Sequence, residues 1–78
     1  MLNMEEVVGI IRKVPSSSQV DMLTQLAYGP KYDLTQQLRV SAAVDRFEAH
    51  SILAYVLSHT MSDEHNTQYV RKQLGLEA

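Results

Sequence analysis

Apolar residues along this chain recur every three or four positions, which is the spacing of one face of an α-helix. The first such stripe consists of Met4, Val7, Val8, Ile11 and Val14. It predicts a helix over residues 4–13, beginning with a capping box in which Asn3 and Glu6 each accept a hydrogen bond from the other's backbone amide. No alternation of polar and apolar residues is long enough to indicate a β-strand. The pattern therefore predicts an all-α fold.

Capping residues and glycines mark the boundaries of further helices. Helix starts are expected near Ser18, Asp33 and Ser62, because Ser and Asp side chains accept hydrogen bonds from the free amides of a first turn. Helix ends are expected at Gly29 and Gly75, where glycine readily adopts the left-handed conformation that closes a helix. All 78 residues are therefore expected to form a single compact domain of four to five helices, bundle-like or orthogonally packed.

Six successive apolar residues form the most unusual segment, and we call this run, Ile52–Leu57, the girdle. Six successive residues of a helix point in every direction, so the girdle leaves no face for water. We expect a central and most buried helix over about 42–59. Residues 34–59 contain no Gly or Pro, so they could form one helix or two. We expect two, with a break near residues 39–41, because globular helices are usually much shorter than 26 residues.

The girdle predicts a contact with another protein chain. A domain of this size buries only about 60% of the surface of its unfolded chain, so its own helices offer limited cover. We expect the interface to include Phe47, Ile52, Tyr55 and Val56, with the uncovered side at Tyr55 or Val56. The partner is expected to be a second copy, in a two-fold homodimer, or a larger protein. The predicted function is a non-enzymatic interaction or regulatory module that self-associates.

One segment, Leu-Thr-Gln-Gln-Leu-Arg-Val-Ser-Ala-Ala-Val-Asp-Arg-Phe-Glu at residues 34–48, resembles the helix-turn-helix of many bacterial repressors. Its Thr35, Leu38 and Val40-Ser41 stand where that family has its first helix and turn. The resemblance implies an alternative function, a transcriptional regulator that binds DNA. The residues expected to contact DNA in that case are Arg39, Ser41, Ala42, Arg46 and His50.

This resemblance covers about a fifth of the chain and departs from the family's pattern at two positions. Arg39 stands where the family usually has the glycine of the turn, and Asp45 stands where a buried aliphatic residue normally holds the recognition helix. The formal net charge is −2 and the isoelectric point about 5.8, so the chain has no overall positive field for phosphates. Nucleic acid is therefore a possible but not a favoured partner.

Composition also bears on compartment and membrane. The chain has no cysteine, which excludes disulfides and suits an intracellular, cytoplasmic protein. No apolar run approaches the roughly 20 residues that cross a bilayer, so no membrane partner is expected.

Residue patterns that would indicate catalysis, a cofactor or a metal are absent from the sequence. His59 and His65 flank Asp63 and Glu64, but these residues lack the paired histidines, four positions apart, of a metallohydrolase helix. The three glycines are isolated, so they form no phosphate-binding loop. We therefore expect no enzyme activity, no cofactor and no metal site.

Overall fold

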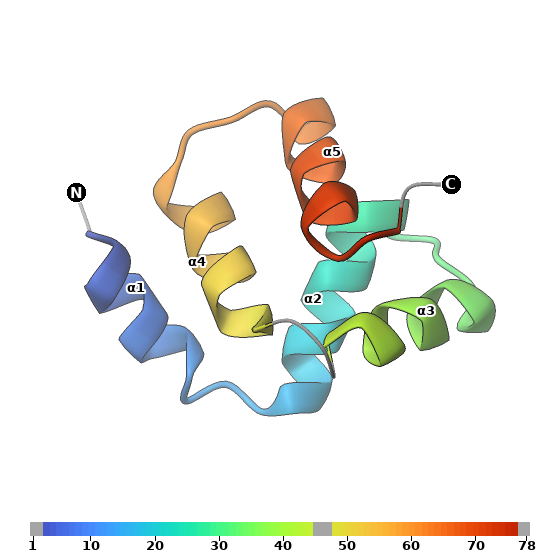
Figure 1. Ribbon diagram of the computed structural model, residues 1–78, viewed down its shortest axis with the longest axis horizontal. Coiled ribbons are helices and arrows are strands. Elements are labelled where there is room, and N and C mark those ends of the chain that lie inside the picture. The colour runs from blue at the N-terminus through green and yellow to red at the C-terminus, as the bar shows by residue number, and fades with distance from the viewer. Residues whose placement is uncertain (1–2, 45–47, 77–78) are drawn as a thin grey trace.

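The computed structural model describes residues 3–44 and 48–76, and within these ranges the chain forms five helices and no strand (Figure 1). The helices are α1 (Met4–Ile11), α2 (Ser16–Tyr28), α3 (Leu34–Val44), α4 (Ala49–Ser58) and α5 (Asp63–Gln73). Helix α4 lies in the middle and packs against α1, α2 and α5, whereas α3 packs chiefly against α2. The predicted all-α class with a central girdle helix is confirmed.

Three of the predicted helix starts are confirmed by hydrogen bonds. The Asn3 side chain accepts from the amide of Glu6 at 2.9 Å. Asp33 and Gln36 form a reciprocal pair, in which each side chain accepts from the other's amide at 2.8 and 3.0 Å. At the start of α5, the hydroxyl of Ser62 accepts from the amide of His65 at 3.1 Å. These caps each depend on residues only three positions apart, which is why the sequence predicts them well.

Two boundaries in the first half of the chain differ from the prediction. Helix α1 ends at Ile11 rather than at residue 13, and α2 begins at Ser16 rather than near Ser18. The earlier start follows from Pro15, whose carbonyl accepts from the amides of Ser18 and Gln19 and so closes the first turn directly after the proline.

The predicted break near residues 39–41 is wrong, because α3 is continuous from Leu34 to Val44. Val40 is fully buried, and this packing outweighs the weak intrinsic helix preference of a β-branched residue. The separation between the two helices comes later, between Val44 and Ala49. The central helix is therefore shorter than the predicted range 42–59, since it begins at Ala49 and ends at Ser58.

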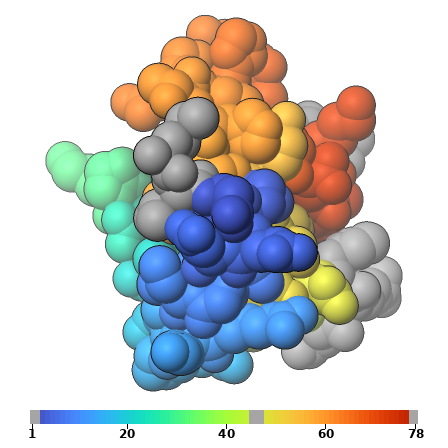
Figure 2. All heavy atoms as spheres, turned by 90° about the vertical axis from the view of Figure 1, so that its left-hand side faces the viewer, coloured from blue at the N-terminus to red at the C-terminus, as the bar shows by residue number. Residues whose placement is uncertain are grey.

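The core is built around α4. Four girdle residues are buried, and the other helices contribute aliphatic side chains from their inner faces. In Figure 2, which looks onto α1, atoms of α1 lie in front of the yellow and orange atoms of α4. The buried apolar residues are Val7, Ile11, Leu23, Ala27, Val40, Ala43, Ile52, Leu53, Ala54, Val56, Val70 and Leu74.

Helix α5 is fixed to the end of α2 because two of its side chains donate hydrogen bonds to carbonyls in the last turn of α2. The hydroxyl of Thr67 donates to the carbonyl oxygen of Leu26, and Nε of Arg71 donates to that of Ala27, both at 2.7 Å. The Arg71 guanidinium also lies 5.1 Å from the ring centroid of Tyr28. The two side chains thus supply donors to carbonyls of the last turn of α2, and the positive charge of Arg71 complements the negative end of the helix dipole.

Replacing Arg71 with alanine should lower the free energy of unfolding by about 2 kcal/mol, because a hydrogen bond from a charged donor and a cation–π contact are both lost. Chemical denaturation followed by circular dichroism measures this change. Lys72→Ala is the matched control, because Lys72 is the exposed neighbour on the same helix and should change stability by less than about 0.5 kcal/mol. Equal effects of the two substitutions would show that the bond between α5 and α2 contributes little.

Candidate functional site

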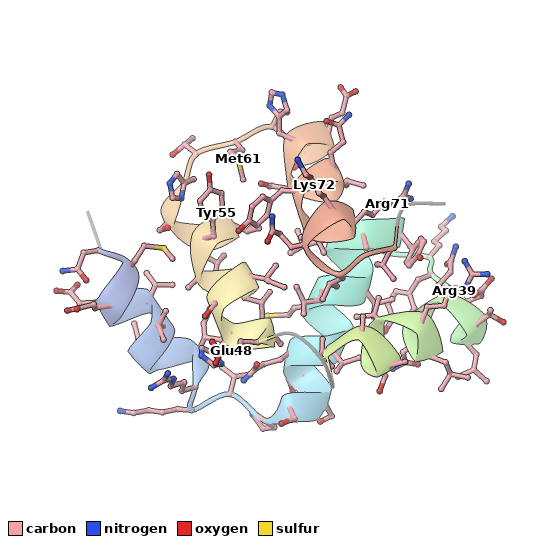
Figure 3. The ribbon with its side chains drawn as sticks, viewed as in Figure 1. Arg39, Glu48, Tyr55, Met61, Arg71 and Lys72 are labelled. Atoms are coloured by element: carbon pink, nitrogen blue, oxygen red, sulfur yellow. The ribbon has the colours of Figure 1, made fainter. Side chains whose placement is uncertain are left out.

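The Tyr55 side of the girdle is covered by aromatic rings of the same chain (Figure 3). The ring centroid of Tyr55 lies 3.9 Å from that of His59 and 4.3 Å from that of Tyr69, and both pairs are stacked. Stacking of this kind adds to the burial of each ring. This side of α4 is therefore covered within the chain.

A different side of the girdle opens into a groove of about 460 Å³. Leu53 and Leu57 stand two positions before and after Tyr55, which places them about 200° around the helix from it. They form part of the groove between α4, the second half of α2 and the start of α5. We call it the girdle groove, and its lining residues are Met22, Gln25, Leu26, Gly29, Pro30, Leu53, Val56, Leu57, Asp63, Asn66 and Thr67.

Leu57 is the most exposed residue of the girdle. Its exposed fraction is 64%, whereas Leu53 and Val56 are buried and form the floor of the girdle groove. A leucine that is held at the edge of an apolar groove extends the surface against which another side chain could pack. The uncovered side of the girdle is therefore at Leu57.

The girdle groove carries an acidic side chain and no cation among the described residues that line it. Asp63 lies in the first turn of α5, and neither Lys nor Arg is among the groove residues. Gln25, Asn66 and Thr67 add uncharged polar groups that can both donate and accept. The Oδ1 atom of Asn66 is buried without a hydrogen-bond partner among the described residues, so it offers no surface to an incoming group. The groove is therefore suited to an apolar group that is flanked by a cation.

A second apolar surface lies on α3. Leu34 and Leu38 are 67% and 59% exposed, and because they are four residues apart they lie side by side on one face of the helix. Val40 and Ala43, on the other face, are buried. We call the exposed pair, Leu34 and Leu38, the α3 ridge. Arg39 is exposed at the edge of the molecule (Figure 3), about 100° around α3 from Leu38.

Most of the predicted interface residues are covered within the chain rather than exposed for a partner. Ile52 and Val56 are each only 6% exposed, so they belong to the core, although Val56 also reaches the girdle groove. Tyr55 is partly buried in its aromatic stack. The expected uncovered side at Tyr55 or Val56 is thus corrected to Leu57. Phe47 lies outside the described residues.

The residues predicted to contact DNA are spread over two helices. Arg39 and Ala42 are exposed on α3 and Ser41 is partly buried there, whereas His50 is on α4, and Arg46 lies outside the described residues. Nε2 of His50 lies 3.7 Å from Glu48 and 3.4 Å from the guanidinium of Arg12. Because α3 is continuous, the turn expected at residues 39–41 is absent. DNA binding remains a prediction without the local geometry that suggested it.

Neither a metal cluster nor a membrane span occurs in the described ranges. Within residues 3–44 and 48–76, no three His, Cys, Asp or Glu side chains come together to hold a metal ion. None of the helices described is long and apolar enough to cross a membrane. In comparisons with known proteins, no family model, curated protein or solved structure matches this chain.

Neither the α3 ridge nor the girdle groove is predicted from the sequence. The leucine spacing in the ridge is visible in the sequence, but Val40, Ala43 and Val44 form a competing apolar stripe on the same helix. The groove combines residues from three separate helices, so no local pattern indicates it. Leu57 was included in the girdle, but its exposure depends on where α2 and α5 dock.

Stability should fall at alkaline pH partly through Tyr69. Burial raises the pKa of Tyr69, and repulsion from the charge of Tyr55 raises it further. The folded state therefore holds this proton more tightly than the unfolded state. This stabilisation is fully present below the ordinary tyrosine pKa of about 10 and is lost as pH rises through the raised pKa of the folded state.

In Tyr69→Phe, the decrease in unfolding free energy between about pH 9 and about pH 11 should be smaller than in the wild-type protein. Denaturation at each pH, with every protein compared with its own value at pH 7, measures this difference. An identical decrease in both proteins would contradict the assignment to Tyr69.

Proposed function

We propose that this chain is a non-enzymatic protein–protein interaction module that self-associates through apolar helix faces. The observation that carries the proposal is the α3 ridge, two leucines more than half exposed on a helix whose other face packs on α2. Single exposed leucines are common, whereas two adjacent ones join into a continuous apolar surface against which another chain can pack. The cysteine-free composition supports an intracellular site of action.

The strength of the association can be bounded from the ridge. Burying a leucine fully contributes about 1.5–3 kcal/mol, so two leucines together contribute about 3–6 kcal/mol at most. Association costs at least about 4 kcal/mol in lost translational and rotational freedom. The ridge alone therefore supports only weak binding, and a stable complex needs a complementary surface that adds further burial.

The mean mass in solution should rise above 8.8 kDa as the protein is concentrated, and Leu38→Gln should return it towards the monomer. Glutamine has nearly the helix propensity of leucine, so this change removes apolar surface without weakening α3. Light scattering after gel filtration measures the mass at a series of concentrations.

The matched control for this experiment is Ile10→Gln. Ile10 is 56% exposed on α1, so the substitution removes a similar apolar surface from a different helix. Self-association should persist in this variant. A wild-type protein that stays monomeric up to about 1 mM would overturn the proposed function, because its dissociation constant would then lie well above that concentration.

A further inference from the structure

We propose that the self-association is head-to-tail, with the α3 ridge of one copy seated in the girdle groove of the next. This inference rests on the proposed function and names the partner surface. The occupant of the groove is a second copy of this chain, and the chemistry of the two surfaces supports that choice.

The girdle groove is large enough to hold the two leucines of the α3 ridge. The girdle groove, at about 460 Å³, lies within the range of about 300–1,000 Å³ in which protein pockets enclose a whole ligand. Helices that bind in grooves insert apolar side chains from positions i and i+4. Leu34 and Leu38 have this spacing and are exposed. The groove has room for a pair of aliphatic side chains, and the ridge supplies such a pair.

The charges of the two surfaces are also complementary. Among the described residues that line the groove, Asp63 carries a negative charge and neither Lys nor Arg is present. Arg39 follows Leu38 and points about 100° further around α3, so its long side chain lies at the flank of the ridge. A cation at the flank of two apolar anchors therefore complements an apolar groove whose charged group is a carboxylate.

A ridge-to-ridge contact is the competing arrangement. A two-fold antiparallel pairing of α3, centred midway between Leu34 and Leu38, would bury both leucines of each copy. It would leave Leu57 and the girdle groove uncovered. Seating the ridge in the groove covers both apolar surfaces in one contact.

A head-to-tail contact has a consequence for assembly size. A head-to-tail dimer has a free ridge on one copy and a free groove on the other. Further copies can therefore add until a ring closes or a filament forms. The wild-type protein should therefore assemble beyond the dimer. A ridge-to-ridge contact would stop at two copies.

The experiment mixes two variants that each lack one half of the contact. Leu38→Gln removes the ridge and Leu57→Gln removes the edge of the groove, and both leucines are largely exposed, so both variants should fold. Circular dichroism checks the fold, and sedimentation equilibrium measures the mass. Each variant alone should be monomeric. The equimolar mixture should form dimers and nothing larger, because one intact ridge and one intact groove remain.

The outcomes separate this inference from the proposed function. If Leu38→Gln dissociates but Leu57→Gln assembles like the wild type, the self-association stands and the head-to-tail contact is overturned. If both variants are monomeric and their mixture is too, the ridge does not bind the groove and the inference is overturned. A wild-type protein that is monomeric throughout would overturn both.

A charge variant gives an independent check that leaves the apolar surfaces intact. Asp63→Asn should raise the dissociation constant several-fold at low salt and have less effect at high salt, because the lost interaction is electrostatic. Glu64→Asn, an equal charge change at an exposed position that is not among the groove residues, is the control. Equal effects of the two substitutions would contradict a contact at Asp63.

Discussion

Covering a helix that is apolar on every side is the constraint on which this structure depends. The girdle places hydrophobic residues all around α4, and a chain of 78 residues has few elements with which to bury them. Helix α1, the pair α2 and α5, and the stacked rings beside Tyr55 cover most of that surface. Leu57 is left at the edge of the girdle groove. The candidate site is thus the part of the core that the fold does not close.

The arrangement of the other helices determines the shape of this site. Thr67 and Arg71 attach α5 to the end of α2, and this attachment holds two of the helices that line the girdle groove together. Helix α3 is placed differently, because it packs chiefly on α2 and turns two leucines away from the core. One chain therefore presents an apolar groove and an apolar ridge on different elements, which is the arrangement that a head-to-tail contact requires.

Local features of the fold could be predicted from the sequence, but tertiary ones could not. The caps at Asn3, Asp33 and Ser62 depend on neighbours three residues away, so the sequence contains all that is needed. The break expected near residues 39–41 is absent because the burial of Val40 outweighs local propensity. Similarly, α3 carries two apolar stripes, and only the docking of α2 decides which becomes core. The prediction that the uncovered side of the girdle lies at Tyr55 or Val56 is wrong for a similar reason, because the docking of the other helices decides which side is covered.

The contact between the α3 ridge and the girdle groove is tested most directly by an isotope-filtered NMR experiment on a concentrated equimolar mixture of labelled and unlabelled protein. Its signals arise only between methyl groups of different copies, so they identify the residues that meet across the interface. The ridge-in-groove contact predicts signals between the methyls of Leu38 in one copy and those of Leu57 in another. Signals between Leu38 and Leu38 alone, or no intermolecular signal at a concentration where the protein is assembled, would contradict it.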